Sequence, residues 1–320
     1  MTHMPMTAQE AQRARLTRSA AFASIAMALF LAGAKVWAVM QTSSTAMLGS
    51  LADTTLDLIA SIATLVGVWI AAMPADHHHR FGHGKAEALS AMFQVVLIAL
   101  SAFGLAFRAI EQWLSGSRVA EAEGGIFVSI IAIIATLALL GWQRYVIRRT
   151  TSVAIATDHL HYKSDLALNL AVIAALVLDR YVGLTGVDPL FGLAIALWLG
   201  FSAFRAAGEA IDHLMDKEWP EEKREEFLAA IANHPELRGV HDLRTRNSGT
   251  RDFVQFHAAV DPQMTVAEAH RVMDELEAKI ERDFPGVEVL IHPDPEGLVD
   301  ETGVAAEELL PELSDRSEGA

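Results

Sequence analysis

The chain has 320 residues, of which 52% are hydrophobic, with a mean hydropathy of +0.28 and a formal net charge of −15. An ordinary soluble protein is less apolar than this. The negative charge argues against nucleic acid as a partner, since phosphate binding needs clustered Lys and Arg. The chain contains no cysteine, so any metal must be held by His, Asp and Glu rather than by thiolates.

Apolar residues are concentrated before about residue 215, in stretches separated by short polar segments. Crossing a bilayer takes about 20 residues. The stretches of sufficient length are 19–40, 46–73, 86–114, 124–147, 152–183 and 188–215. We therefore predict an all-α bundle of six transmembrane helices. The polar segment before it lacks the pattern of a cleavable signal, so the first span is expected to stay in the membrane.

Lys and Arg in the short connecting segments predict the orientation of this bundle, because cytoplasmic loops carry an excess of them. The N-terminal segment and the second and fourth loops hold the basic residues Arg13, Arg15, Arg18, Arg80, Lys85, Arg144, Arg148 and Arg149. The other loops are nearly free of them. We therefore expect a multi-pass membrane protein with both termini in the cytoplasm.

The character of the sequence changes after Asp216. The segments predicted there are a helix over 221–234, strands over 239–246 and 252–260, a helix from Thr265 to about 284, and a strand over 287–292. Glu268 occupies the capping-box position of the second helix. The order α-β-β-α-β predicts a small α+β domain, with both helices on one face of a three-stranded sheet.

The predicted spans and strands divide the chain into four parts. They are an N-terminal tail over 1–18, a transmembrane domain over 19–216, a cytoplasmic α+β domain over 217–296 and an acidic tail over 297–320. The acidic tail is expected to be disordered because like charges repel and few apolar residues are present.

Two ionisable pairs lie within the predicted second and fifth spans: Asp53 with Asp57, and His161 with Asp165. The members of each pair are four residues apart, so on an α-helix they point from one face. Ionisable groups at membrane depth are costly and usually mark an ion path. Three carboxylates and one imidazole also suit zinc or a similar divalent cation. The quartet therefore predicts a metal-transport site.

The charge of this quartet predicts what replaces the metal. With a divalent ion bound and the imidazole neutral, the net charge is 2 − 3 = −1. Three unscreened negative charges are untenable in a low dielectric, so the empty site should take up protons, with His161 as the natural acceptor. The alternative is that these groups form interhelical hydrogen bonds or a buried proton relay. Asp158 and His159 point elsewhere on the helix and are interpreted as supporting or pore-lining residues.

A histidine-rich segment follows the second span, with Asp76, His77, His78, His79 and His83 within eight residues. Imidazoles and a carboxylate this close together are a ready cation site. A solvated, pH-sensitive loop is the alternative interpretation. Because the loop is expected on the cytoplasmic side, loading or regulation fits it better than transport itself.

The predicted α+β domain contains a third group of metal-type side chains. His241 begins the first strand, His257 lies in the second, and His292 ends the third, with Asp294 two residues further on. Three strands of one sheet can bring these side chains together, which predicts a metal site. His270, on the second helix, is positioned to join a second ion.

In combination, these motifs resemble the cation diffusion facilitator family, most closely its bacterial zinc and ferrous-iron efflux members. The resemblance covers about residues 15 to 296. Its motifs are Leu51-Ala-Asp53-Thr-Thr-Leu-Asp57, Pro74-Ala-Asp76, Phe81-Gly82-His83-Gly84-Lys85-Ala-Glu87, His161-Tyr-Lys-Ser-Asp165, His241-Asp-Leu-Arg244-Thr-Arg246 and Ile291-His292-Pro-Asp294-Pro.

The resemblance implies a homodimer that exchanges metal for protons by alternating access, with a metallochaperone-like cytoplasmic domain. By motif match, the transport site is Asp53, Asp57, His161 and Asp165. The loop site is Asp76, His79 and His83. A binuclear site at the dimer interface is His241, His257, His270, His292 and Asp294. Lys85 and Asp216 match an interprotomer salt bridge.

With this resemblance, the sequence predicts a proton-coupled antiporter for divalent cations in the bacterial inner membrane, not an enzyme and without an organic cofactor. Zn²⁺ is the expected substrate and regulatory ion, with Cd²⁺ or Fe²⁺ as alternatives, because an imidazole ligand suits zinc-like ions. A membrane metal sensor that binds without transporting is the main rival. A di-metal oxidoreductase would need Glu-x-x-His pairs within the bundle, and the predicted spans have none.

Overall fold

The computed structural model describes residues 8–42, 45–115, 126–182, 187–232 and 234–297. Some side chains within the helices, Asp53 among them, lie outside this description, as does the predicted acidic tail beyond Gly297. The chain forms two compact units, Met1–Leu214 and Met215–Ala320. Their boundary falls close to the domain division predicted after residue 216.

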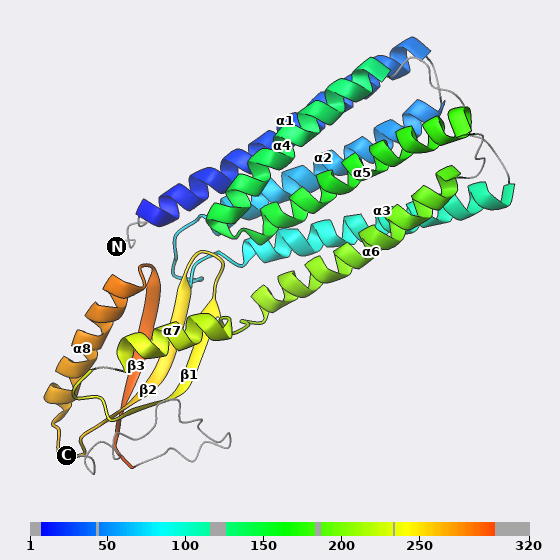
Figure 1. Cartoon of the computed structure of the whole chain (residues 1–320). Coiled ribbons are helices and arrows are strands. Elements are labelled where there is room, and N and C mark those ends of the chain that lie inside the picture. Colours follow the sequence, from blue (N-terminus) through cyan, green and yellow to red (C-terminus); the bar gives the residue numbers. More distant parts are fainter. Residues whose placement is uncertain (1–7, 43–44, 116–125, 183–186, 233, 298–320) are drawn as a thin grey trace. The chain divides into compact units, whose positions relative to one another are not determined.

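The first unit consists of long helices that lie side by side (Figure 1). Within the described residues they are α1 (Ala8–Thr42), α2 (Thr45–Ala71), α3 (Ala86–Ser115), α4 (Ile126–Thr150), α5 (Val153–Val182) and α6 (Val187–Leu214). Each overlaps most of one predicted apolar stretch. Helix α3 packs along α6, α1 contacts α2 and α4, and α5 contacts each of the other five.

Four of these helices are long and apolar enough to cross a membrane. The qualifying segments are Glu10–Trp37, Thr54–Ala71, Ala86–Ser115 and Pro189–Leu214. Charged side chains keep the described parts of α4 and α5 out of this set. Helix α4 ends with Arg144, Arg148 and Arg149, and the first half of α5 carries Asp158, Lys163 and Asp165. Six membrane spans therefore stay a prediction.

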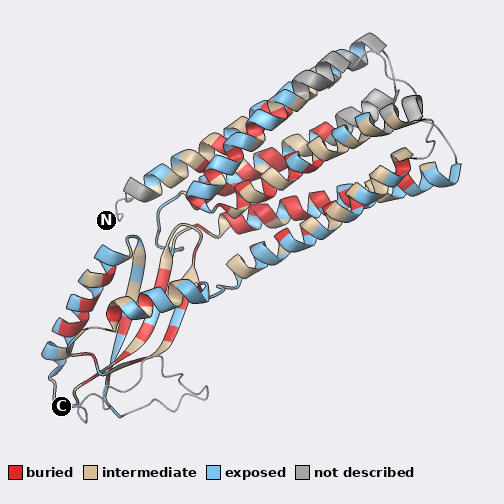
Figure 2. Cartoon of the chain, in the orientation of Figure 1, coloured by how far each residue is buried: buried red, intermediate tan, exposed pale blue. Residues whose placement is uncertain are grey.

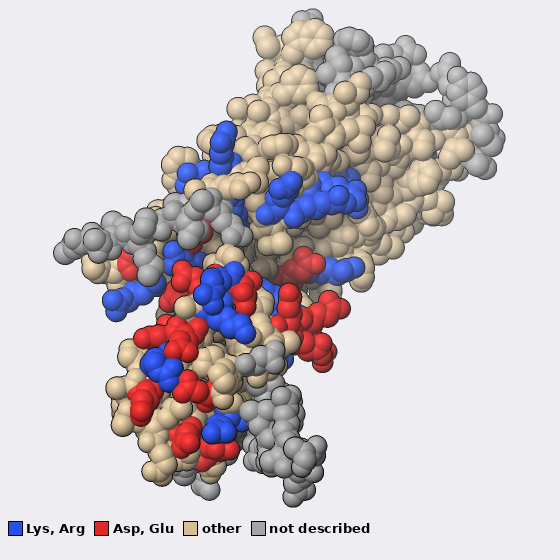
Figure 3. Space-filling view, turned by 60° about the vertical axis from the view of Figure 1, so that its left-hand side comes forward, with Lys and Arg blue, Asp and Glu red and all other residues tan. Residues whose placement is uncertain are grey.

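The burial pattern of the helical unit is the reverse of a soluble protein's. Large apolar side chains face outward, with Phe103 73% and Phe204 77% exposed, whereas polar Gln94, Gln143 and Asp158 are buried (Figure 2). On the face seen in Figure 3, Lys and Arg gather at one end of this unit and the remaining described surface is uncharged. Lipid around the bundle accounts for this inversion, because bare apolar surface of this extent is costly in water.

Residues 8–18, expected to form part of an N-terminal tail, are instead the first turns of α1. An ion pair holds them against the bundle: Nη1 of Arg13 lies 3.1 Å from Oε1 of the buried Glu87 on α3. Nε of Arg13 also donates to the carbonyl of Thr150, and the hydroxyl of Ser152 donates to Glu87. Sequence patterning missed this segment because its polar residues make long-range contacts rather than an apolar stripe.

The second unit has the predicted α-β-β-α-β order. Its elements are α7 (Glu221–Ile231), β1 (Gly239–Asn247), β2 (Asp252–Val260), α8 (Val266–Asp283) and β3 (Val287–Pro295). The sheet order is β1-β2-β3, with β1 antiparallel and β3 parallel to β2. The predicted capping box of α8 is confirmed, since Thr265 accepts from the backbone N–H of Glu268 and Glu268 accepts from that of Thr265.

Both helices of this unit pack on one hydrophobic core with the sheet. Phe227 of α7, Phe256 of β2 and Leu276 of α8 all belong to it. Side chains alternate along β2, so Val254, Phe256, Ala258 and Val260 are buried in the core while His257 lies on the opposite face. A bulge at Asp242, where φ is 50°, restores this alternation in β1 after His241.

Candidate metal centres

A cluster of metal-type side chains lies between α2 and α5. Nε2 of His161 is 3.1 Å from Oδ1 of Asp57 and 3.6 Å from Oδ2 of Asp165. One ligand atom from each residue lies within 4.8 Å of the others. Nε2 is buried and faces both carboxylates, so the three side chains turn their ligand atoms toward one another. The three side chains fit a divalent ion by donor type and by spacing.

Asp53, the fourth member of the predicted quartet, lies on α2 one turn before Asp57. Its side chain is outside the described residues. The helical spacing places the two residues on the same face of α2, because residues four apart are neighbours on a helix.

A buried hydrogen-bond network fixes α5 next to this cluster. The Asp158 carboxylate accepts from the hydroxyl of Ser24 at 2.5 Å, from Nε2 of Gln143 at 2.8 Å and from Nε2 of Gln94 at 3.1 Å. These donors come from α1, α4 and α3. A buried carboxylate with three donors joins four helices at one point, and it supports the cluster without being part of it. This agrees with a supporting role for Asp158.

Tyr162, next to His161, anchors the same turn of α5. Its hydroxyl donates to the backbone carbonyl of Ser24 at 2.8 Å and lies 3.1 Å from the hydroxyl of Ser61 on α2. The tyrosine ring meets the His161 ring edge-on, with centroids 5.4 Å apart. Tyr162 thus ties the turn of α5 that carries His161 to α1 and α2. The sequence signal for this network was Gln94 and Gln143, polar residues within apolar spans.

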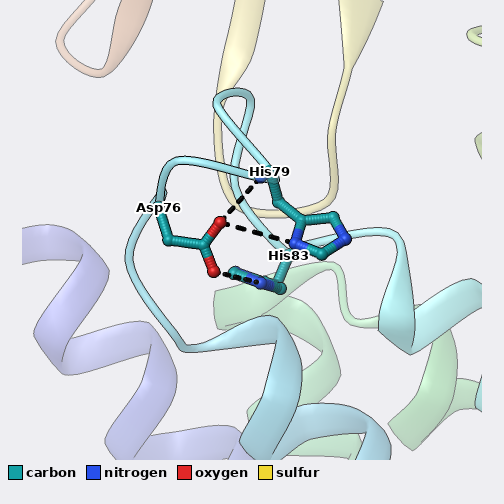
Figure 4. A group of neighbouring side chains, drawn as sticks. All are labelled: Asp76, His79 and His83. Carbon is teal, nitrogen blue, oxygen red and sulfur yellow. Dashed lines mark hydrogen bonds and ion pairs between the residues drawn. The ribbon is translucent and has the colours of Figure 1, made fainter.

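The second cluster lies in the loop between α2 and α3 (Figure 4). Asp76 faces both imidazoles, with Oδ1 3.5 Å from Nδ1 of His79 and Oδ2 3.4 Å from Nε2 of His83. The backbone turns back at Gly82, where φ is 84°. His77 and His78 are exposed and stand outside this group. The loop therefore brings together the three residues that the family motif indicated.

Hydrogen bonds prepare Asp76 as a ligand. The backbone N–H groups of His79 and His78 donate to Oδ1 at 2.7 and 2.8 Å. These bonds, with that from His79 the stronger influence, hold the pKa of the Asp76 carboxyl below its usual range. The carboxylate is therefore ionised at neutral pH, and Oδ2 faces His83.

The third cluster forms a row across the open face of the sheet. The strand register places His241 opposite His257 and His257 opposite His292. Asp294 joins them: Oδ2 lies 2.7 Å from Nδ1 of His257 and 3.2 Å from Nε2 of His241, and Oδ1 lies 3.2 Å from Nε2 of His292. Of these four residues, His241, His257 and Asp294 offer ligand atoms within 4.8 Å of one another.

Three predicted site residues are not brought into these clusters. His270 is exposed on α8, where Nδ1 lies 3.6 Å from Asp274. Nζ of Lys85 donates to the carbonyl of Leu214 in its own unit. Asp216 belongs to the other unit and lies 3.9 Å from Nη1 of Arg246. Among the described residues, His270 therefore stands outside the metal-type cluster on the sheet.

Comparison with known proteins covers both units. The family profile of the cation efflux transmembrane domain matches residues 21–215, and that of the cation efflux protein cytoplasmic domain matches 219–296. The cation-efflux pump FieF of Pectobacterium atrosepticum is 40% identical over 90% of this chain and 96% of its own. FieF of Escherichia coli O127:H6 has the same identity and coverage. A solved structure of CzrB in its zinc form is 40% identical over 26% of this chain and 97% of its own, with a TM-score of 0.25.

Proposed function

This chain belongs to the cation diffusion facilitator family, and we propose that it exports Zn²⁺ from the bacterial cytoplasm in exchange for protons. The cluster of Asp57, His161 and Asp165 carries this proposal. Its metal-type side chains come from two helices of a bundle whose outer surface is apolar, which supports the proposal. We include Asp53 as the fourth ligand because it lies one turn before Asp57 on α2.

The choice of zinc rests on the donor set. Imidazole nitrogen suits Zn²⁺ and Cd²⁺, whereas manganese and magnesium favour sites made of oxygen alone. His161 is the imidazole donor of the cluster, and the two described carboxylates supply oxygen. Cd²⁺ and Fe²⁺ are the alternative substrates.

Proton coupling follows from the charge of the cluster. Its carboxylates lie within a few ångströms of one another, so they repel when no cation is present. Protons relieve this repulsion in the empty state, and the metal relieves it in the loaded state. The protons and the ion therefore compete for the same atoms, which is the basis of an antiport. The titration belongs to the cluster as a whole rather than to one residue.

The proposed topology is six spans with both termini in the cytoplasm. Helices α4 and α5 would complete the set of six, with their charged residues turned toward the bundle or toward one end. Arg148 and Arg149, in the last turn of α4, fit a cytoplasmic end.

The loop and sheet clusters are proposed as cytoplasmic metal sites of a homodimer. The sheet face that carries His241, His257 and His292 is not covered by α7 or α8, and Leu290 on the same face is 63% exposed. A second copy on this face would place His270 to join an ion. Lys85 and Asp216 would pair between protomers. Metal bound at the sheet would then shift the conformational equilibrium of the helical bundle, because the two sites are thermodynamically linked.

Flux through purified protein tests the proposal. As Zn²⁺ enters proteoliposomes that contain the wild type, protons should leave and the lumen should become more alkaline. Asp57→Ala and His161→Ala should abolish both fluxes while the dimer stays intact. Unchanged flux in both variants would contradict the site assignment. A wild type that binds Zn²⁺ but moves neither zinc nor protons would instead support the rival function, a non-transporting membrane metal sensor.

A further inference from the structure

Lys35 is a cationic side chain on α1 that contacts α2 beside the metal cluster. Its ammonium donates to the hydroxyl of Thr54, which is fully buried. Thr54 follows Asp53 and lies three residues before Asp57. Lys35 lies seven residues before the end of α1, and Thr54 lies nine residues after the start of α2. At 1.5 Å per residue, the two residues are about 10 and about 14 Å from the adjoining ends of their helices, so they lie at a similar height along the bundle.

An ammonium group at this depth needs negative charge nearby. Moving a lysine into an apolar bundle is costly unless it is paired or reaches water. The Thr54 hydroxyl accepts a hydrogen bond but carries no charge, so it satisfies one donor without balancing the cation. Asp53 and Asp57, which flank Thr54 along α2, are the carboxylates of the proposed site that lie nearest to it in the chain, and we take them to balance this charge.

We propose that Lys35 is a fixed positive charge that weakens metal binding at the Asp57–His161–Asp165 cluster and thereby speeds release of the ion. This inference rests on the proposed transport function. With Asp53 included and the imidazole neutral, the loaded site carries 2 − 3 = −1 without Lys35 and 2 − 3 + 1 = 0 with it. Lys35 is a positioning charge, because a protonated ammonium group cannot ligate the metal and its hydrogen bond to Thr54 holds it against α2.

The physical reason is that a transporter must let its ion go. A site with three carboxylates in a low dielectric holds a divalent cation tightly, and binding that is too tight stops turnover. A unit charge several ångströms from a divalent ion changes its binding by a factor of about ten or more at the effective dielectric of protein sites. Lys35 thus lowers the affinity of the cluster for zinc and raises the rate of zinc release.

Three substitutions separate this role from a structural one. Lys35→Gln removes the charge but keeps a donor for Thr54, and Lys35→Arg keeps the charge. Lys279→Gln is the control: it removes one lysine charge from α8 of the second unit and leaves the helical unit unchanged.

Zn²⁺ binding to the full-length protein is measured by competition with a chelating dye. The cluster's share is defined as the binding that Asp57→Ala removes. For Lys35→Gln we expect this share to tighten about tenfold, with a lower KM and a maximal flux reduced about fivefold or more in proteoliposomes. Lys35→Arg and Lys279→Gln should stay within about twofold of the wild type in both measurements.

Unchanged or weaker zinc binding in a folded Lys35→Gln dimer would overturn the inference. Should that variant fail to fold, Thr54→Val decides, since it removes the hydrogen bond and keeps the charge. Wild-type affinity in Thr54→Val supports the electrostatic role, and weakened affinity overturns it. A wild type that binds zinc without transporting it contradicts the proposed function, while the binding comparison still decides the role of Lys35. A wild type without Asp57-dependent binding contradicts both.

Discussion

The helical unit and the sheet use the same ligand types but hold them in different ways. Between α2 and α5, Asp57 and His161 meet through the packing of two helices, so a shift of one helix changes their separation. On the sheet, His241, His257 and His292 are neighbours in the strand register, fixed by backbone hydrogen bonds. A cluster that depends on helix packing can open and close, whereas a cluster fixed by strand pairing cannot. The first is therefore suited to exchange and the second to steady binding.

Removing one ligand from each cluster should produce the largest difference between them. Asp57→Ala should lower zinc flux about a hundredfold or more, because the carboxylate is lost from the transported ion's shell. His257→Ala should change maximal flux less than about fivefold, since the sheet site only biases the bundle. Radioactive zinc uptake into proteoliposomes measures both. Equal losses in the two variants would show that the clusters are not functionally distinct.

Next in size is the loss of the network that holds α5. Asp158→Ala would leave the donors of Ser24, Gln94 and Gln143 without their acceptor in the bundle interior. We expect a loss of stability on the order of 3 kcal/mol, read as a lower melting temperature in detergent. Asp274→Ala, at an exposed carboxylate on α8, is the control and should leave the melting temperature unchanged. A wild-type melting temperature for Asp158→Ala would contradict the network's role.

The sheet cluster should depend on Asp294, which lies within 3.2 Å of a ring nitrogen of each histidine in the row. Asp294→Ala is expected to weaken zinc binding at the sheet about tenfold or more, with flux less affected. Histidine resonances of the full-length protein, followed during zinc titration, report this binding. The matched variant is Asp242→Asn, which suits the positive φ there and alters a carboxylate 3.9 Å from His257. Similar effects of the two changes would argue against Asp294 as the central ligand.

The smallest expected effect is at the cap of α8, away from either cluster. Thr265→Ala should cost about 1 kcal/mol and speed amide hydrogen exchange in the first turn, whereas Thr265→Ser should not. The backbone N–H and then the hydroxyl of Thr265 lower the pKa of Glu268 from its ordinary 4.5. The contribution of Glu268 is therefore present above pH 4.5 and disappears as the pH falls through its lowered value. Exchange that is insensitive to Thr265→Ala would exclude the cap as a source of stability.

The sequence was most informative where a local rule decides the outcome. Apolar length predicted the long helices, alternation predicted β2, and the Thr265–Glu268 spacing predicted the capping box. The row of histidines on the sheet also followed, because register aligns residues at corresponding places in neighbouring strands.

Long-range polar contacts were not predictable in the same way. The pairing of Arg13 with Glu87 and the three donors around Asp158 join helices that are far apart in sequence. No periodicity encodes such contacts, since each depends on how the helices rotate and pack. The contact between Lys35 and Thr54 belongs to the same class. His270 shows the converse: its residue type suits a metal, but its place on an exposed helix puts it outside the cluster of its own chain.

An anomalous-scattering map of the zinc-loaded full-length protein would show whether the facing side chains of α2 and α5 share one ion. We expect a zinc peak within about 2.0–2.2 Å of Nε2 of His161 and of carboxylate oxygens of Asp57 and Asp165. Zinc bound only at the loop or the sheet, with these three side chains empty at saturating metal, would contradict this expectation.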